Sequence, residues 1–362
     1  MNRYLSLLLI FLGFLCFFSC RPSVEENTDD KIIELYPITA EKCMNIIQMM
    51  DKHSFGYMDK TGRCVIKPIF AHEGGYFNNG LAYASVNPGT LDQGKRGYIN
   101  TKGEFVIQPQ FSEAHSFSEG LAIVGDLFGK VGYINTSGRF VIKIKYESAE
   151  DFSEGLAAVS LDGEKEGYIN KKGKMVIKPK FDIACKFKEG MGRVEVDDKW
   201  GFIDKKGNYV VEPKYNHARD FSDGLAPVKV GNLYGYIDKK GNMVIPPRFT
   251  NADVFSEGLA VVIVDGKTGF IDKTGRMIIE PQFDETTIWD DFSGFKDGRA
   301  CVCINGKYGF IDKSGKVVIP PIYEFNSHFK NGLALVSDGY DYIRYIDTNG
   351  RVIWKADGNI KY

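Results

Sequence analysis

The 362-residue sequence lacks the features that most directly indicate an enzyme or a nucleic-acid-binding protein. It has 46 Lys and Arg against 47 Asp and Glu, so there is no basic excess for binding a phosphate backbone. It contains no Gly-x-Ser-x-Gly elbow, no phosphate-binding loop and no dinucleotide-binding glycine pattern. These absences argue against nucleic acid as a partner, and against the hydrolases, NTPases and nicotinamide enzymes that carry such motifs.

Histidine is scarce, and its positions do not suggest a metal site. The five histidines have no i, i+4 pairing and are scattered over different parts of the chain: His53, His72, His115, His217 and His328. His115 and His217 each stand beside an alanine in a segment that connects predicted strands, and we expect both to be exposed. The sequence therefore predicts neither a metal nor a cofactor.

Cysteine is too sparse and too irregular for a disulfide framework or a zinc site. Beyond Cys20 the chain has an odd number, without paired metal-type spacing: Cys43, Cys64, Cys185, Cys301 and Cys303. Cys301 and Cys303 lie two apart in a predicted strand, so their side chains should share one face. We interpret most of these cysteines as small buried hydrophobic residues.

The only long apolar run is short for a membrane span. It extends from Tyr4 to Phe18, whereas a spanning helix needs about 20 residues, so we interpret residues 1–19 as a cleaved export signal, with a retained helix as the alternative. Ser19 followed by Cys20 resembles a bacterial lipoprotein signal, although Phe17 stands where Leu is usual. This resemblance implies cleavage before Cys20 and attachment of lipid to Cys20. The alternative is an ordinary secretory signal with an incidental cysteine.

The segments after the signal differ in composition. Residues 20–31 are polar and acidic and contain Pro22, which predicts a lipid-anchored, solvated tether. Residues 32–53 are interpreted as an N-terminal cap, with a short helix over residues 39–50 covering the first unit of the array that follows. The array itself is assigned to residues 54–362.

Glycine is abundant, and most of its 40 occurrences mark an internal repeat. The sequence Gly-Phe-Ile-Asp-Lys-Lys-Gly at 201–207 recurs in nine degenerate copies, most of them 34 or 35 residues apart. The copies begin at Gly56, Gly97, Gly132, Gly167, Gly201, Gly235, Gly269, Gly309 and Arg344. A chain built from one unit is more typical of a scaffold with a binding surface than of an enzyme with one unique site.

One copy predicts the structure of the unit. Asp204 and Gly207 specify a hairpin turn between two β-rich runs, and Pro213 places the second run at a sheet edge. A third run, Leu225–Val230, follows a connection whose Phe221 we expect in the core, and it should pair with the first strand of the next copy. Adjacent apolar residues in the strands indicate burial on both faces, so the sheets must stack.

We therefore predict an all-β fold. It is a tandem array of about eight to nine three-stranded antiparallel meanders, stacked as a β superhelix or a propeller-like assembly, with a short N-terminal helix. The unit resembles the WG (KWG) repeat, as found in repeat proteins of the bacterial lipoprotein type, over roughly residues 54 to 354. The naming Trp-Gly pair is complete only at Trp200–Gly201, while in six other copies the residue before the glycine is Arg96, Val131, Glu166, Tyr234, Thr268 or Tyr308. The resemblance implies an architecture and not an activity.

We place the candidate binding residues where the repeat varies. They are Trp200, Tyr234, Tyr308, Arg96 and, in one of two insertions, Trp289. The insertions lie near residues 87–94 and 286–291, and tolerated surface loops are the alternative interpretation. A further pattern is a row of acids before the connection glycine, which either binds cations or basic partners or forms a solvated edge that discourages aggregation: Glu119, Glu154, Asp223, Glu257 and Asp297.

The function expected from these patterns is that of a non-catalytic lipoprotein of the bacterial cell envelope, on the periplasmic or the surface side. The chain would reach the membrane through its N-terminal lipid and would bind a protein or glycan partner. The alternative is an envelope enzyme acting on glycans, since a glycosidase needs only two carboxylates. Such a site would lie near the insertions, because acids that recur in every unit do not converge on one point.

Overall fold

A computed structural model of the chain describes residues 36–39, 54–71, 74–85, 94–285, 294–339 and 343–355. Within these ranges the chain forms 34 strands in seven sheets and no helix, which confirms the all-β prediction. The helix predicted for residues 39–50 finds no support, because Thr39 ends strand β1 (Tyr36–Thr39) and residues 40–53 lie outside the described ranges. The export signal, Cys20, the tether, the first insertion up to residue 93, the second insertion and Trp289 also lie outside them.

The remaining strands follow one another with short connections. In chain order they are β2 (Ser54–Met58), β3 (Cys64–Ala71), β4 (Leu81–Ser85), β5 (Arg96–Asn100), β6 (Phe105–Phe111), β7 (Glu113–Ala114), β8 (Leu121–Gly125), β9 (Val131–Asn135), β10 (Phe140–Tyr146), β11 (Ser148–Ala149), β12 (Leu156–Ser160), β13 (Glu166–Asn170), β14 (Met175–Phe181), β15 (Ile183–Lys188), β16 (Met191–Val196), β17 (Lys199–Ile203), β18 (Tyr209–Tyr215), β19 (His217–Ala218), β20 (Leu225–Val230), β21 (Leu233–Asp238), β22 (Met243–Phe249), β23 (Asn251–Ala252), β24 (Ala260–Val264), β25 (Lys267–Ile271), β26 (Met277–Asp284), β27 (Phe295–Lys296), β28 (Arg299–Ile304), β29 (Lys307–Ile311), β30 (Val317–Tyr323), β31 (Phe325–Asn326), β32 (Leu333–Ser337), β33 (Ile343–Asp347) and β34 (Val352–Lys355).

The sheet formed by β15 to β18 shows the unit. Its order is β15-β16-β17-β18, with every neighbouring pair antiparallel. The prediction that the third strand of one copy pairs with the first strand of the next is confirmed by the pairing of β16 with β17. The three-stranded description was incomplete, because the segment after most outer strands adds a fourth strand, often of only two residues, such as β7.

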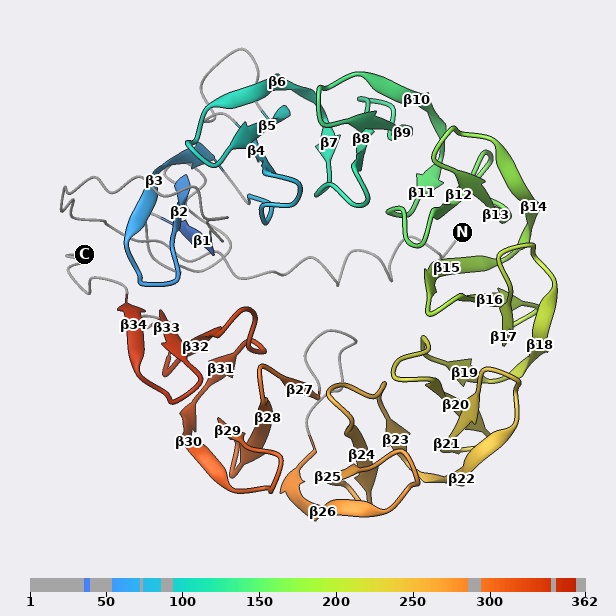
Figure 1. Cartoon of the computed structure of the whole chain (residues 1–362), viewed down its shortest axis with the longest axis vertical. Helices are drawn as coiled ribbons and strands as arrows, with labels where there is room; N and C mark the ends of the chain where they lie inside the picture. The colour runs from blue at the N-terminus through green and yellow to red at the C-terminus, as the bar shows by residue number, and fades with distance from the viewer. Residues whose placement is uncertain are drawn as a thin grey trace.

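The sheets stand side by side around a propeller-like ring (Figure 1). Strands β6, β10, β14, β18, β22, β26, β30 and β34 follow the outer rim, and the loops after the short strands point inward (Figure 1). Two sheets are longer because neighbouring units join through a single bridge, Ala71 with Ser85 and Asp284 with Cys303. Most inner strands are buried on both faces, as predicted; β8 and β12 are buried along their whole length.

The predicted hairpin turns are present in all nine copies. In the copy at 204–207, the Gly207 N–H donates to the Asp204 carbonyl at 3.0 Å, and the Asp204 carboxylate accepts from the Lys206 and Asn208 N–H groups at 2.8 and 3.0 Å. Gly207 has a φ of 86°, which a residue with a side chain adopts only under strain. Local sequence alone therefore determines these turns.

The glycine after Trp200 is required for a different reason. Trp200 pairs with Tyr215 and Phe202 with Val211, so β18 advances four residues where β17 advances two. This bulge brings the outer strand over Gly201, where a Cβ atom would lie 2.5 Å from the Val211 oxygen and 2.7 Å from the Pro213 nitrogen. The first glycine of the repeat is thus fixed by close approach of the backbone.

Each connection is anchored in the core by its phenylalanine, as predicted. Phe221 is buried, and its ring lies 4.8 Å from that of Phe202. In several units a buried tyrosine takes the place of Phe202 and donates its hydroxyl to a carbonyl of the connection, as Tyr133 does to Glu150 at 2.8 Å. The equivalent phenylalanines are also buried: Phe117, Phe152, Phe187, Phe255, Phe295 and Phe329.

The first and last units pack against each other and close the ring. Met58 and Leu333 form a buried cluster with Tyr345, Ile353 and Trp354. A Cβ atom on Gly62 would lie 2.5 Å from the carbonyl oxygen of Ile353. Of the two arrangements predicted from the sequence, this closure selects the propeller-like one over an open superhelix.

Candidate functional site

The antiparallel strands place their connections alternately on two opposite faces of the ring. The turn face carries the Asp/Asn-x-x-Gly turns and the loops that contain the sequence Phe-Ser-Glu-Gly or its variants. The hairpin face carries the short hairpins between the third strand of one copy and the first strand of the next. The two faces differ in how their polar side chains are used.

On the turn face, the acid row joins each unit to the next. The Glu154 carboxylate accepts from the Gly190 N–H at 2.9 Å and pairs with Lys205 at 3.0 Å, while the Ser153 hydroxyl donates to the Phe187 carbonyl at 2.6 Å. The same acid-to-glycine bond recurs for Glu119 with Gly155, Glu189 with Gly224, Asp223 with Gly258, Glu257 with Gly298 and Asp297 with Gly332. The acid row therefore holds neighbouring units together. The sequence had suggested either binding of cations or basic partners or a solvated edge, and neither interpretation included this role.

The electrostatics of the row agree with this role. Burial alone would raise the pKa of Glu154, but the bonds from Lys205 and Gly190 outweigh it and hold the pKa below its usual value. Among the residues that the structure describes, no group of His, Cys, Asp and Glu has an arrangement suited to a metal ion.

On the hairpin face, the candidate residues before each glycine occupy equivalent places. Each lies across from an aromatic residue of the outer strand: Arg96 from Phe111, Trp200 from Tyr215, Tyr234 from Phe249 and Tyr308 from Tyr323. Tyr234 is buried, and the other three are half-buried. Arg96 and Tyr308 stand in other parts of the ring, so only Trp200 and Tyr234 come close to each other.

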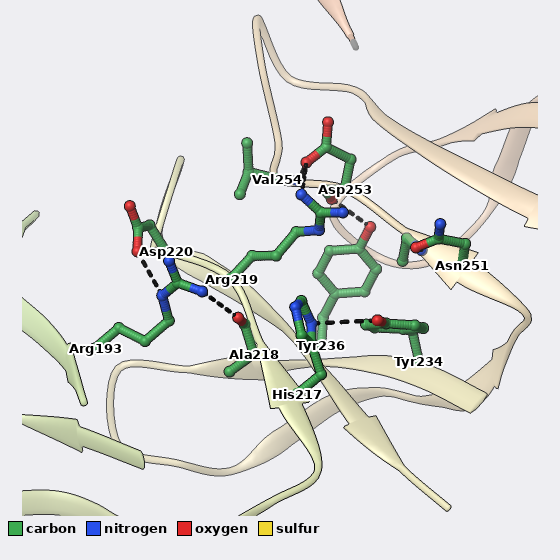
Figure 2. A network of polar contacts seen from close by, with 11 residues as sticks. Arg193, His217, Ala218, Arg219, Asp220, Tyr234, Tyr236, Asn251, Asp253 and Val254 are labelled. Atoms are coloured by element: carbon green, nitrogen blue, oxygen red, sulfur yellow. Dashed lines mark hydrogen bonds and ion pairs between the residues drawn. The ribbon is translucent and has the colours of Figure 1, made fainter. Parts of the chain in front are cut away.

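His217 connects these two aromatic residues across neighbouring sheets. Its ring centre lies 6.4 Å from that of Trp200. The ring centre of Tyr234 lies 5.8 Å away on the other side, and the His217 Nδ1 is 3.2 Å from the Tyr234 hydroxyl (Figure 2). Trp200 belongs to β17, whereas His217 and Tyr234 belong to β19 and β21 of the next sheet. We call these three side chains the aromatic row.

His217 is half-buried, so the prediction that it is exposed was wrong. The cause is its position in the short strand β19, between two large rings. Burial, together with the positive charges of Arg219, Arg193 and Lys229, lowers the pKa of His217 to about 4. The imidazole is therefore neutral at pH 7. His115 is also half-buried, although 43% of its side chain is exposed, and it lies 2.7 Å from Glu113.

Two arginines support the aromatic row. The Arg193 guanidinium lies over the Trp200 ring at 4.7 Å. It also pairs with Asp220 at 2.9 Å and donates to the Ala218 carbonyl at 2.6 Å (Figure 2). Arg219 and Asp253 are both buried and lie 3.7 Å apart, and the Tyr236 hydroxyl donates to the Asp253 carbonyl at 2.7 Å (Figure 2). A buried pair of this kind is costly to break from one side only.

Sequence reasoning did not find these arginines or an apolar tip on the same face. Arg219 follows the recurring alanine, where other units have His115, Glu150 or Cys185, and this variability was the available signal. Leu127 and Phe128 are 84% and 88% exposed at the tip of the β8–β9 hairpin. Two large apolar residues in a predicted hairpin turn were the signal for this tip.

The cysteines behave as small side chains. Cys303 is buried, and Cys64, Cys185 and Cys301 are half-buried. Burial raises the pKa of Cys185 to about 11, so this thiol is not activated as a nucleophile. Within the described ranges there is also no helix long and apolar enough to cross a bilayer.

Comparison with known proteins identifies the repeat. The pattern of a family described as "WG containing repeat" matches residues 55–87, 97–125, 132–164, 167–200, 200–234, 234–267, 269–308 and 308–342. Comparison with curated protein sequences gives no match.

Solved structures show distant similarity only. BamB from Moraxella catarrhalis is 10% identical with a TM-score of 0.43, and the match covers 67% of this chain and 87% of BamB. PorZ, a surface component of the type-IX secretion system of Porphyromonas gingivalis, is 9% identical with a TM-score of 0.34, over 67% of this chain and 38% of PorZ. A eukaryotic initiation factor is 14% identical with a TM-score of 0.48, over 73% and 82%. These values carry no argument about function.

Proposed function

The chain belongs to the WG containing repeat family, and on that premise we propose that it is a non-catalytic binding scaffold of the bacterial cell envelope. The ring would be held at the membrane by lipid on Cys20 and would bind a protein or glycan partner on its hairpin face. The lipid anchor and the location rest on the sequence around Ser19 and Cys20.

The observation that carries the proposal is the difference between the two faces. On the turn face, the recurring Glu, Ser and Lys side chains bond one unit to the next. On the hairpin face, the residue before the glycine varies, and the aromatic row assembles across two sheets. Specific recognition needs such a non-repeating arrangement, and aromatic side chains with a nearby arginine are typical of binding surfaces.

The chemistry of the row favours binding over acid–base catalysis. A general base works best with a pKa near the working pH, whereas the pKa of His217 is about 4. Its Nδ1 is already within hydrogen-bond distance of Tyr234. The half-buried Trp200 and His217 rings can stack against a sugar ring or a peptide side chain, and the Arg193 guanidinium can donate hydrogen bonds to it.

Affinity capture on intact cells tests the proposal, with captured material examined for both protein and glycan. The variants are Trp200→Ala and a control, Tyr209→Ala, which removes an aromatic residue at the turn end of the same sheet. We expect wild type and Tyr209→Ala to retain the same partner and Trp200→Ala to lose it, with all three folded by circular dichroism. Retention by Trp200→Ala and loss on deleting residues 286–291 would instead locate binding at the insertion.

A further inference from the structure

The outer rim carries a cluster of basic side chains that the aromatic row does not involve. Its members, which we call the lysine rim, come from β10, β14, the turn that precedes β10 and the turns at 171–174 and 204–207, and they are all exposed: Arg139, Lys143, Lys145, Lys172, Lys174, Lys178, Lys180 and Lys206. Among the described residues, the ion pairs on this side use the neighbouring Lys171 and Lys205 instead. The rim therefore carries a concentrated positive charge in a chain whose formal net charge is −1.

Contacts between units make the lysine rim continuous. A Cβ atom on Gly173 would lie 3.1 Å from Ile142, which places the turn at 171–174 beside β10. In the same way Gly207 lies against Ile177, and Lys180 donates to the Gly207 carbonyl at 3.2 Å, which places the next turn beside β14. The two strands and their two turns thus form one surface of neighbouring outer edges (Figure 1).

The repeat does not impose the charge at the strand positions of the rim. At the places of Lys143 and Lys145 in β10, and of Lys178 and Lys180 in β14, other outer strands carry Gln108 and Gln110, Glu280 and Gln282, or Pro320 and Ile322. The fold tolerates neutral and acidic residues at these positions. The lysine rim is therefore a local property of two neighbouring units.

Apolar side chains are exposed among the lysines. Phe140 is 46% exposed, and Val141 and Val176 are each 42% exposed. Lysine mixed with exposed apolar side chains on a convex edge is typical of surfaces that lie on a bilayer interface. Lysine acts as a point charge and suits the diffuse charge of a lipid surface, whereas specific anion recognition favours the arginine fork.

We propose that the lysine rim docks the ring on an anionic lipid bilayer. Lys143, Lys172 and Lys178 lie near the headgroups in this arrangement, and Phe140 and the valines reach the interface. Strand addition by a partner is disfavoured here because Pro179 and the lysines interrupt the edge of β14. This inference does not depend on the aromatic row.

Sedimentation with lipid vesicles tests the docking. The protein is the chain from residue 21 onward, which contains every strand of the described structure and lacks Cys20. The triple variant Lys143→Gln, Lys172→Gln, Lys178→Gln is compared with a control of equal charge change, Lys102→Gln, Lys240→Gln, Lys316→Gln, whose lysines are exposed beside turns of other units. Vesicles are neutral phosphatidylcholine or the same lipid with about 30% phosphatidylglycerol, to provide an anionic surface.

We expect wild type to bind the anionic vesicles, to leave the neutral ones unbound, and to dissociate as salt rises from about 50 to about 300 mM. Each lysine near an anionic surface contributes about fivefold, so the triple variant should lose on the order of a hundredfold in partitioning and the control under about threefold. Equal losses in both variants, or equal binding to neutral vesicles, would overturn the proposal. The proposal would also be overturned if the protein bound an anionic polysaccharide but did not bind the anionic vesicles.

Discussion

Gly201 and Gly224 recur at fixed places in the repeat, but for different physical reasons. Gly224 has a φ of 88° and open space around its Cα, so only its backbone conformation requires glycine. Gly201 lies under the bulged strand β18, with the Val211 oxygen 2.5 Å from the place a Cβ would take. The sequence predicted the turn glycines from local chemistry, but it could not predict the requirement at Gly201, which depends on a neighbouring strand.

Alanine substitutions separate these two causes. Gly224→Ala should lower the free energy of unfolding by about 1 kcal/mol, the usual cost of the left-handed conformation. Gly201→Ala should cost about 3 kcal/mol or more, because the backbone of β18 must move away. Urea unfolding followed by circular dichroism measures both. Equal losses in the two variants would contradict the close-approach explanation.

His217 should make stability depend on pH. Its pKa is about 4 in the folded protein and near 6.5 in the unfolded chain, so the unfolded state binds the proton more tightly. The neutral side chain is favoured above pH 6.5, and stability falls as the pH drops from 6.5 toward 4.

The variant His217→Gln tests this dependence. At pH 5 the protonation of His217 should cost about 1 to 2 kcal/mol, after allowance for its partial exposure. The loss of melting temperature between pH 7 and pH 5 should therefore be smaller in His217→Gln than in wild type. A loss of the same size in both proteins would show that other groups cause it.

At the level of elements, the connection loops act as clamps between units. Ser153 and Glu154 bond to the main chain of the next loop, and Lys205 from a neighbouring turn pairs with Glu154. The sequence showed the acids as a row, but it could not show their partners, which lie 36 and 51 residues further along the chain. The short fourth strand was missed for the same reason, since a two-residue ladder depends on its neighbour and not on its own propensity.

The Glu154 clamp should contribute measurable stability. Glu154→Ala should lower the free energy of unfolding by about 1 kcal/mol through loss of the bond to Gly190. A double-mutant cycle with Lys205→Ala should give a coupling energy of about 0.5 kcal/mol, since the pair is partly exposed. Glu164→Ala, at an exposed hairpin tip, is the control and should change little. A coupling energy of zero would show that the ion pair between Glu154 and Lys205 does not contribute to stability.

The stability that the Glu154 clamp contributes should fall in acid, because the pKa of this carboxyl group is lowered in the folded protein. The pKa of Glu154 is below its ordinary value of 4.5, so the stabilisation is complete above that pH and is lost as the pH falls below it. The free energies of unfolding of the Glu154→Ala variant and of wild type should therefore become more similar as the pH falls below 4.5.

At the level of the whole molecule, the described parts of the first and last units meet by side-chain packing, and no strand pair among the described residues joins them. The first and last units meet through Met58, Leu333 and Trp354, and the main chain of Ile353 lies over Gly62. The repeat predicted stacked sheets, but the choice between superhelix and ring depends on a small rotation at every junction. That rotation is not encoded in any one copy, which is why closure could not be predicted from the sequence.

Trp354→Ala should loosen the closure without unfolding the interior units. Removing this ring leaves Met58 and Tyr345 less covered, so hydrogen exchange should rise in β2, β3, β33 and β34. Exchange in β16 to β18, on another part of the ring, is the internal control and should stay unchanged. A uniform rise around the ring would indicate a cooperative scaffold in which closure supports every unit.

Photo-crosslinking on intact cells most directly tests the claim that the repeat builds the scaffold and the hairpin face binds the partner. A benzophenone amino acid is placed at Asn232 or at Lys240, which are exposed beyond opposite ends of β21. From position 232 we predict one saturable crosslinked product that is lost in the Trp200→Ala background, and from position 240 we predict none. A product from position 240 alone, or products from 232 that persist without Trp200, would contradict the claim.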